Sequence, residues 1–541
     1  MAEEFTAEER AALAPYVTDL DGPVFALVNL PEVVKGALFA RYSRSPKSLR
    51  RLFLDEFLTP EGLEPATART AAVGTERAEQ LYERVFVEYG DDSVAQLGGV
   101  HLACEGASNI LTKVLEWGRL MAYLEQSTRY IPYDDRPGGR YRYHVPEELA
   151  GELSHRYVAA LDRAFDTYAA WLPRMREFYA ARFSRPEGES ESVWRTTIRA
   201  KALDTLRGLL PAATISNVGI YGTGQAYEQL LLRMRAHPLR EARAYAELML
   251  AELRRVIPAF LRRVDIPERG GAWSAYLAET REATREAAAR LLDGAEASAE
   301  TPGEDEVTLT DFDPEGEVKV VAAALYGVSA LPDARLLALV RRMTDDERAA
   351  VLAAYVGKRS NRRHRPGRAF ERTSYRFDIL GDYGAFRDLQ RHRLLTLEWQ
   401  RLTPYHGYVI PEAVVEAGAR DDWRRVMEEA AALHDAIASA GLAEVASYAV
   451  SMAYRVRFYM ELNAREAMHV IELRTAPQGH PSYRRVCQAM HRLIADRAGH
   501  RAIAAAMTFA DHSEVELERL EAERAAERRR SALDPERKES R

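Results

Sequence analysis

The chain has 541 residues, a net charge of -7 at pH 7 and 47% hydrophobic residues. This length exceeds the usual single hydrophobic core, so two or more domains of roughly 200 residues are expected. The charge balance excludes the overall basicity of a dedicated nucleic-acid-binding protein, so any polyanion must be bound by local clusters. Arginine would supply such clusters, since only seven of the 75 cationic residues are Lys, although codon composition explains that bias equally well.

The cysteine content and the N-terminal segment indicate a cytoplasmic protein. Cys104 and Cys487 form no Cys-x-x-Cys pair, which fits a reducing compartment and argues against a disulfide scaffold. The first residues are acidic, and no apolar stretch approaches the ~20 residues that span a bilayer. Cys487, His491 and His500 are residue types that can bind a metal, but their spacing is common by chance on an amphipathic helix. We therefore predict no metal site.

The N-terminal half is predicted to be mostly helical. Near Val24 a short apolar segment leads into an Ala-rich, helix-forming one. From residue 107 to 127 the apolar residues recur at helical spacing, which predicts a packing helix that ends at the sequence EQSTRY. Residues 184–192 predict an exposed loop within an insertion of about one helical hairpin. The glycines of residues 219–225 predict a bend and not a dinucleotide-binding turn.

The segment 291–317 is rich in Ala, Glu, Gly, Asp and Pro and predicts a linker. It separates an N-terminal domain, residues 1–290, from a C-terminal domain, residues 318–514. The C-terminal domain opens near Val318 like the first one, and residues 373–380 alternate as in a half-buried strand. Residues 463–474 have the spacing of a packing helix. Residues 515–541 form a tail of mixed charge, typical of a solvated or frayed helix.

The two domains repeat one another. The stretch from residue 115 to 134 superposes without a gap on residues 389–408. Residues 224–243 match residues 464–485 when Arg233 is aligned with Arg474 and a short gap is allowed. The same order of elements occurring twice indicates an internal duplication, and two copies of this length predict a fused pseudo-dimer.

The C-terminal half carries a group of cationic and hydrogen-bonding residues. Arg391, His392 and Arg393 are consecutive, so on a regular helix they would spread over ~200° and converge only at an element end or a subunit contact. Arg465 and His469 share one helical face. Such a lining suits a phosphate, a pyrophosphate or the edge of a heteroaromatic ring, whereas an isolated Arg would favour a salt bridge.

The N-terminal half offers a different group. Glu125, Ser127, Arg129 and Tyr130 lie within six residues, so a hydroxyl, backbone N–H groups and a guanidinium could face one cavity. Taken alone, this short motif is better explained as a helix terminus and turn. Later in the chain, Arg207 and Arg233 could complete a phosphate clamp.

A basic run extends from Lys358 to Arg372. It has the charge of a nucleic-acid patch, but it contains a single aromatic residue for stacking. A loop that contacts a charged cofactor or a partner subunit explains the run equally well. We therefore expect nucleic acid not to be the main ligand.

These motifs resemble the flavin-dependent thymidylate synthases, the ThyX family, whose signature is R-H-R-x-x-S followed by S-x-R-Y. In the C-terminal half the matching residues are Arg391, His392, Arg393 and Thr396, then Asn463, Arg465 and Arg474 at the Asn-Ala-Arg and Leu-Arg positions. The expected Ser and Arg of S-x-R-Y fall on Arg401 and Thr403.

The N-terminal half has kept the other part of that signature. Its matching residues are Glu125, Ser127, Arg129 and Tyr130, with Arg207, Arg233 and His237 at later family positions. Trp117-Gly118-Arg119 replaces Arg-His-Arg, and Thr223-Gly224-Gln225 replaces Asn-Ala-Arg. The losses in the two halves are therefore complementary.

The resemblance implies an α+β fold of two ThyX-like repeats, each mostly helical with a small antiparallel sheet. It also implies sites built at subunit contacts of a homotetramer, so a homodimer of the fused chain would form a pseudo-tetramer. The implied reaction is reductive methylation of dUMP to dTMP, with FAD as cofactor and NADPH and methylenetetrahydrofolate as co-substrates.

The implied roles divide between the halves. The N-terminal half would bind the nucleotide, with Ser127 and Arg233 at the reaction centre. The C-terminal half would hold the flavin. The nucleotide set is Glu125, Ser127, Arg129, Arg207 and Arg233, and the flavin set is Arg391, His392, Arg393, Asn463, Arg465 and His469. The changes at Trp117-Gly118 and Arg401-Leu402-Thr403 favour an alternative, a catalytically decayed paralogue that binds a nucleotide, a flavin or nucleic acid.

Overall fold

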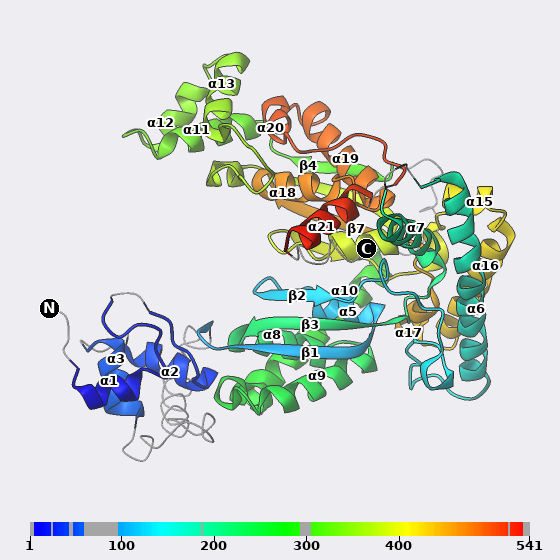
Figure 1. Cartoon of the computed structure of the whole chain (residues 1–541), viewed down its shortest axis with the longest axis horizontal. Coiled ribbons are helices and arrows are strands. Elements are labelled where there is room, and N and C mark those ends of the chain that lie inside the picture. The colour runs from blue at the N-terminus through cyan, green and yellow to red at the C-terminus, as the bar shows by residue number, and fades with distance from the viewer. Residues whose placement is uncertain are drawn as a thin grey trace. The chain divides into compact units, whose positions relative to one another are not determined.

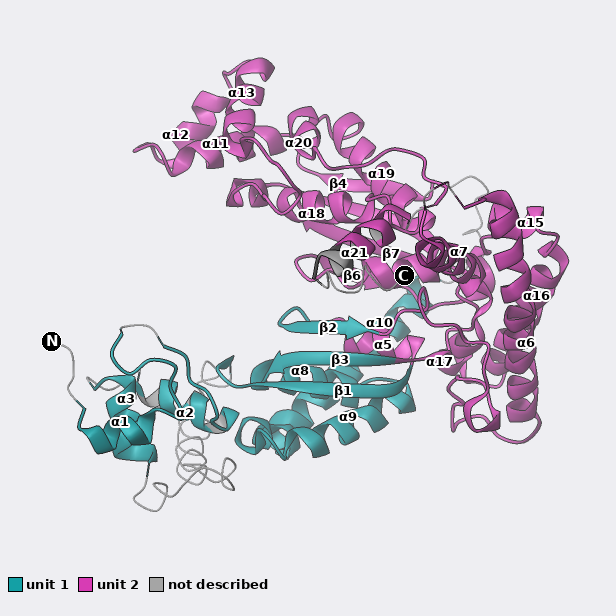
Figure 2. Cartoon of the chain, viewed as in Figure 1, with its two compact units in different colours: residues 1–107, 118–125, 217–296 teal, residues 108–117, 126–216, 297–541 magenta. Residues whose placement is uncertain are grey.

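The computed structural model describes residues 5–22, 25–42, 47–58, 96–185, 187, 189–292, 305–517 and 520–533. The chain forms two compact units (Figure 2). Unit 1 comprises residues 1–107, 118–125 and 217–296, and unit 2 comprises residues 108–117, 126–216 and 297–541. Segments of the N-terminal half thus belong to unit 2, so the boundary between the units does not coincide with the predicted boundary between the repeats.

Unit 1 is built on a three-stranded sheet of order β1-β3-β2, from β1 (Gly99–Ser108, its last residue in unit 2), β2 (Met121–Glu125) and β3 (Ile215–Thr223). Strand β2 runs antiparallel to β3. The Tyr227 hydroxyl of α8 donates to the carbonyls of Val100 and Ile220 at 3.0 and 3.2 Å, which fixes this helix on the sheet. The helices of unit 1 are α1 (Ala7–Leu13), α2 (Glu32–Tyr42), α3 (Leu49–Leu52), η1 (Phe53–Phe57), α8 (Gly224–Arg235), α9 (Arg240–Leu253), η7 (Pro258–Asp265), η8 (Pro267–Gly271) and α10 (Ala272–Leu291).

Unit 2 is built on an antiparallel sheet of order β4-β5-β7-β6. Its strands are β4 (Val307–Phe312), β5 (Ser374–Asp382), β6 (Thr396–Trp399) and β7 (Arg455–Asn463). Buried and half-exposed residues alternate along β7, as expected of a strand whose one face lies on the core. Helices α18 (Ala464–Arg474) and α19 (Pro481–Asp496) pack on this sheet (Figure 1).

A long helical pair extends unit 2. Helix α6 (Gly151–Arg182) packs against α7 (Glu191–Leu206) and against α16 (Arg420–Ser439), where the Trp171 indole donates to Asp422 at 2.9 Å. The other helices of unit 2 are α5 (Asn109–Leu115), η5 (Pro137–Gly139), η6 (Arg207–Leu209), α11 (Gly316–Tyr326), α12 (Asp333–Val340), α13 (Asp345–Val356), η10 (Arg368–Arg372), α14 (Tyr383–Leu389), η11 (Pro404–His406), α15 (Glu412–Glu416), α17 (Ala443–Ala446), η12 (Ser447–Ala449), α20 (Arg501–Ala506) and α21 (Leu520–Leu533).

The structure confirms two repeats. A short 3-10 turn, a strand and a helix occur in this order as η6, β3 and α8, and again as η12, β7 and α18. Each element of the second copy begins 240 positions after its counterpart in the first. Within unit 2 the two copies pair at their own junction. The Ala212 N–H donates to the Val450 carbonyl at 2.8 Å, and the Met452 N–H donates to the Leu210 carbonyl at 2.9 Å. These bonds are equivalent under an exchange of the repeats, as in a twofold-symmetric dimer.

Three sequence-based predictions match the structure. The strand predicted for residues 373–380 is β5, which begins one residue later, at Ser374. The helix predicted for residues 463–474 is α18, which begins one residue later, at Ala464. The described residues between 184 and 190 connect α6 to α7, the predicted helical hairpin. The C-terminal tail contains helix α21, whose Arg524 pairs with Glu189 at 2.5 Å.

Three other predictions were wrong. The helix predicted for residues 107–127 ends at Leu115, and Met121–Glu125 is strand β2, because pairing with β3 determines its conformation. Strand β4 lies inside the predicted linker, of which residues 293–304 are outside the described part. Residues 219–225 were predicted to form a bend, but they form the end of strand β3 and the start of helix α8. At this junction a Cβ on Gly224 would approach the Phe260 side chain to 2.8 Å.

In the described part of the chain, no helix combines the length and the apolar character that crossing a lipid bilayer requires.

Candidate functional site

The predicted Arg-His-Arg group lies at the end of a helix in unit 2. Helix α14 begins after Asp382, whose carboxylate accepts from the Ala385 N–H at 2.9 Å, and it ends at Leu389. Arg391, His392 and Arg393 follow in the connection to β6. The chain turns there, so the three consecutive side chains are not restricted to helical spacing.

Asp388, in the last turn of α14, is the centre of a buried cluster of arginines. Its carboxylate lies 2.5 Å from Arg391 Nη2 and 3.6 Å from Arg474 Nη1. Its other oxygen lies 3.7 Å from Arg207 Nη1. Arg474 also donates to the Asp388 carbonyl. Arg207 comes from the N-terminal repeat and the others from the C-terminal repeat, so unit 2 brings cationic groups of both repeats together.

The arginines of this cluster affect the pKa of Asp388 more strongly than burial does. Burial opposes ionisation of Asp388, but Arg391, Arg474 and Arg207 hold the pKa of its carboxyl well below its ordinary value. The Nη2 atom of Arg207 is buried and has no hydrogen-bond partner among the described residues. An orphaned donor beside a cationic cluster is suited to an acceptor atom of a ligand.

Arg129 is joined to both repeats. It donates through Nε and Nη2 to the Asp204 carboxylate at 2.7 and 2.6 Å. Its Nη1 donates to the Tyr483 hydroxyl at 3.1 Å, and Nη2 also donates to the Gln478 carbonyl at 3.3 Å. Burial raises the pKa of Asp204, but the charge of Arg129 and its hydrogen bonds lower it more. All three guanidinium nitrogens of Arg129 therefore have protein partners.

A cavity of about 380 Å³ lies beside the Arg129–Asp204 pair, entirely within unit 2. Asp204 and His480 contribute to its wall. Burial and the charge of Arg207 lower the pKa of His480 to about 4, so this imidazole is neutral at physiological pH. The other polar residues of the wall include Arg182, Lys201, Glu412, Ser482, Arg485 and Glu516.

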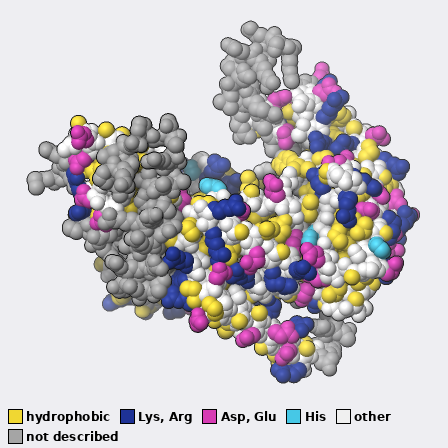
Figure 3. Space-filling view, turned by 90° about the horizontal axis from the view of Figure 1, so that it is seen from below, with side chains coloured by type: hydrophobic (Ala, Val, Ile, Leu, Met, Phe, Trp, Pro, Cys, Tyr) yellow, Lys and Arg dark blue, Asp and Glu magenta, His cyan; other side chains and the backbone are white. Residues whose placement is uncertain are grey.

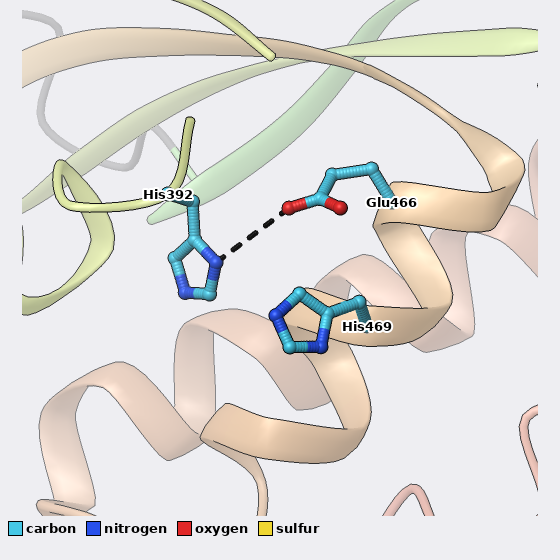
Figure 4. Close-up of side chains that lie close together, drawn as sticks. All are labelled: His392, Glu466 and His469. Atoms are coloured by element: carbon cyan, nitrogen blue, oxygen red, sulfur yellow. Dashed lines mark ion pairs between the residues drawn. The ribbon is translucent and has the colours of Figure 1, made fainter. Parts of the chain in front are cut away.

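Three further side chains meet at the start of α18, as Figure 4 shows. His392 Nδ1 lies 3.7 Å from Glu466 Oε1, and the rings of His392 and His469 are 5.5 Å apart in an edge-to-face arrangement. Arg474 Nε donates to His392 Nε2 at 2.9 Å, and Arg365 Nη2 donates to His469 Nδ1 at 2.9 Å. His392 thus connects this group to the Asp388 cluster.

The same surroundings change the protonation of these groups. Burial and the neighbouring Arg474 hold the pKa of His392 well below its ordinary value. Burial and Arg365 lower the pKa of His469 to about 4. Burial raises the pKa of Glu466 to about 7 despite nearby arginines. Near neutral pH the two imidazoles are uncharged, while Glu466 is close to half-protonated.

His392, Glu466 and His469 have the spacing of metal ligands, with one ligand atom of each within 4.8 Å of the others. Their partners do not suit a metal. An Arg N–H already faces one nitrogen of each neutral ring, so the remaining nitrogen of each ring carries the proton. In metal sites the second ring nitrogen instead donates to a carboxylate or carbonyl. The donor set therefore does not fit a divalent cation.

The other imaginable metal ligands are not gathered. Burial raises the pKa of the Cys487 thiol to about 12. His491 bonds to His512 at 2.9 Å, and His500 bonds to the Tyr375 hydroxyl at 2.8 Å. The two histidines thus each have their own protein partner, and Cys487 is a buried free cysteine.

Two of the remaining flavin-set residues, Asn463 and Arg465, lie at the start of the same helix. The Asn463 side chain caps α18 by accepting from the Glu466 N–H at 2.9 Å. Arg465 donates to the Pro366 carbonyl at 2.9 Å and lies 3.4 Å from Glu371, within the predicted basic run. Arg393 is exposed. The run from Lys358 to Arg372 thus contacts the predicted flavin residues.

The nucleotide set is only partly brought together. Ser127 accepts from the Arg129 N–H at 3.2 Å, which makes the local turn that was one of the two interpretations of this motif. Arg129 and Arg207 lie in unit 2, whereas Glu125 and Arg233 lie in unit 1. Arg233 is largely buried, and burial lowers its pKa.

The alignment of Arg233 with Arg474 was wrong by one position. Helices α8 and α18 both begin directly after their capping residues, Thr223 and Asn463. This register aligns Arg474 with Met234, which is fully buried. Sequence reasoning assigned no role to Arg474, although its Leu-Arg position was the available signal. It also missed Asp204 and Asp388.

The fold and the site define a duplicated α+β protein with one arginine-lined cluster made from both repeats. A family model described as "Thymidylate synthase complementing protein" matches residues 40–259 and 308–498. The chain belongs to this family, which confirms the ThyX-like resemblance of both halves.

Individual relatives fall into two groups. A UPF0159 protein of Chlamydia muridarum is 38% identical over 525 residues, covering 96% of this chain and 98% of the relative. A UPF0159 protein of Thermoplasma acidophilum is 30% identical over 518 residues, covering 90% and 97%. A flavin-dependent thymidylate synthase of a Mycobacterium species (strain JLS) is 29% identical over 189 residues, covering 34% of this chain and 70% of that enzyme. The two UPF0159 proteins therefore match this chain over nearly their whole length, whereas the thymidylate synthase matches about a third of it.

Proposed function

We propose that this protein binds FAD and reductively methylates a uracil nucleotide, dUMP, to dTMP. The observation that carries the proposal is the meeting of Arg207 and Arg129, from the N-terminal repeat, with Arg391 and Arg474, from the C-terminal repeat, inside one unit. The complementary losses in the two repeats are explained if one composite site survives.

The flavin side of this site fits its group by donor chemistry. Arg391, Arg393 and Arg465 supply cationic donors for a diphosphate, and the neutral rings of His392 and His469 leave N–H groups for ring acceptors. Asn463 positions this set by capping α18. When bound, FAD reduced by NADPH supplies the hydride, and methylenetetrahydrofolate supplies the carbon.

The nucleotide side uses the charges on the N-terminal repeat. Arg207, with its orphaned Nη2, would bind an anionic or carbonyl oxygen of the substrate. Arg129 and Ser127 hold the turn beside it, and Glu125 adjoins that turn in sequence. Arg474 takes the role first assigned to Arg233, stabilising negative charge on the pyrimidine, because it lies in the cluster.

We further propose one site per chain and a cytoplasmic homodimer with pseudo-tetrameric symmetry. At positions equivalent to Arg207, Arg129, Arg391 and Arg474, the other repeat carries residues that are not cationic. These residues are Ser447, Thr403, Trp117 and Met234. The Trp117 indole instead donates to the Leu397 carbonyl at 3.1 Å and packs on Trp399, a structural role.

The rival function, a decayed paralogue that binds without turnover, is favoured by one observation. Asp204 and Asp388 already pair with the arginines that a nucleotide would need. A nucleic-acid ligand has less support. On the face in Figure 3, basic and acidic side chains are interspersed, and the described residues visible there form no extended basic stripe.

The test combines a spectrum with complementation. Purified protein should be yellow and bleach with NADPH, and the gene should rescue a thymidine-requiring bacterium. Arg391→Ala and Arg474→Ala should abolish rescue, whereas Arg457→Ala, which removes a strand arginine paired with Asp378, should retain it. Colourless protein, or rescue by both cluster variants, would refute the proposal. Nucleic acid retained through low-salt purification would support the rival.

A further inference from the structure

Asp388 has a feature that the proposed function does not use. It is a buried carboxylate that contacts arginines of both repeats, Arg207 on one side and Arg391 and Arg474 on the other. Helix α14 carries it, and Arg474 also binds its backbone carbonyl, so the carboxylate has little freedom to leave. The equivalent residue in the other repeat is Val114, which carries no charge.

The carboxylate occupies the position that an anionic ligand would seek. Oxygens of a phosphate bind guanidinium groups in the same geometry as carboxylate oxygens do. A phosphate brought to Arg207 and Arg474 would therefore lie close to Asp388, and two like charges at contact distance in a buried site repel strongly. The second carboxylate, Asp204, similarly neutralises Arg129.

A neutral ligand encounters no such repulsion. A pyrimidine carbonyl or a sugar hydroxyl accepts from an Arg N–H without bringing a charge, and the orphaned Nη2 of Arg207 offers such a donor. The electrostatic advantage that a phosphate normally gives a nucleotide over its nucleoside should then be reduced.

We propose that Asp388 is a specificity-determining residue that takes the place of a ligand phosphate among the arginines, so that the site accepts pyrimidine nucleosides nearly as well as their 5′-monophosphates. The identity of the pyrimidine ligand rests on the proposed function. The internal counter-charge does not, because it concerns phosphate and arginine alone.

The experiment measures ligand binding to the full-length protein by calorimetry with three probes: deoxyuridine, dUMP and inorganic phosphate. In the unsubstituted protein deoxyuridine and dUMP should bind within about tenfold of each other. Asp388→Asn should tighten dUMP and phosphate by about tenfold or more and leave deoxyuridine unchanged. Asp378→Asn is the matched control, since it removes the carboxylate of another Arg pair, 3.0 Å from Arg457, and should change none of the three.

The outcomes separate this inference from the proposed function. A preference of the unsubstituted protein for dUMP over deoxyuridine of more than about a hundredfold would overturn the inference and leave the proposed function intact. An Asp388→Asn protein with no gain in phosphate binding would also overturn it. If neither pyrimidine binds but Asp388→Asn gains phosphate, the counter-charge stands and the proposed function fails.

Loss of Asp388 removes a buried partner of three arginines, so folding of the variant must be measured as well. If Asp388→Asn is unstable in chloride, phosphate should restore its melting temperature while leaving that of Asp378→Asn unchanged. Restoration supports the inference, and equal responses of both variants contradict it.

Discussion

At the residue scale, arginines of the candidate site are held in buried ion pairs with Asp204 and Asp388. Arg129 and Asp204 are each about one-tenth exposed and are joined by three hydrogen bonds of 2.6 to 2.9 Å. Removing one partner of such a pair leaves the other charge buried, whereas an exposed pair contributes little.

The first prediction concerns that pair. Arg129→Ala should lower the free energy of unfolding by about 3 kcal/mol, because Asp204 would remain buried without its partner. Arg163→Ala removes a more exposed pair with Glu429 and should change stability by less than about 0.5 kcal/mol. Urea titration followed by circular dichroism measures both. Equal effects would show that Arg129 is not a structural partner.

A second prediction concerns Glu466 and pH. Its folded-state pKa of about 7 lies above the ordinary 4.5, so the folded protein holds a proton that the unfolded chain releases. Stability from this group is present below pH 4.5 and is lost as the pH rises through 7. Glu466→Gln, which stays neutral, should match the parent protein near pH 4.5 and exceed its stability by roughly 2 to 3 kcal/mol at pH 8. A pH-independent difference would contradict this.

At the scale of elements, the repeats use the same local devices for different purposes. Thr223 and Asn463 cap α8 and α18 at equivalent positions. Only the second helix then presents Arg465, His469 and Arg474, so the cap at Asn463 also positions the predicted flavin residues.

The third prediction tests that cap. Asn463→Ala should cost about 1 kcal/mol of stability, because the Glu466 N–H loses its acceptor. It should also weaken flavin binding, measured by fluorescence quenching. Asn463→Asp retains a capping carboxylate and should preserve stability. If flavin affinity fell equally in both variants, Asn463 would contact the flavin directly and would not act through α18.

At the scale of the whole molecule, the two repeats depend on each other within unit 2. Backbone hydrogen bonds join residues 208–213 to residues 448–453, and Arg129 reaches Tyr483. A buried backbone edge that loses its partner is costly, so the C-terminal repeat is incomplete without residues 108–117 and 126–216.

The fourth prediction follows from that dependence. Residues 305–541 produced alone should show no cooperative thermal transition, because the groups that pair with residues 208–213 would be unpaired. Co-expression with residues 1–292 should yield a complex that co-purifies and melts cooperatively. A stable, cooperatively folding fragment 305–541 would mean that each repeat folds as an independent domain.

Local sequence patterns identified elements well where one pattern dominated. The alternation of residues 373–380 and the apolar spacing of residues 463–474 correspond to β5 and α18. The pattern misled at residues 107–127, since Met121–Glu125 takes its conformation from pairing with β3, which lies about a hundred residues further on. Spacing along the chain contains no information about that partner.

The sequence by itself determined the family, the duplication and the division of motifs between the repeats, because these depend on residue order alone. Only the tertiary structure decided that Asp388 and Arg474 join the cluster and that Asp204 pairs with Arg129. It also decided that Met234 and not Arg233 is equivalent to Arg474, and that Glu466 lies beside His392. The physical reason is that ion pairing and burial depend on distances between elements, and folding brings together side chains that are far apart in sequence.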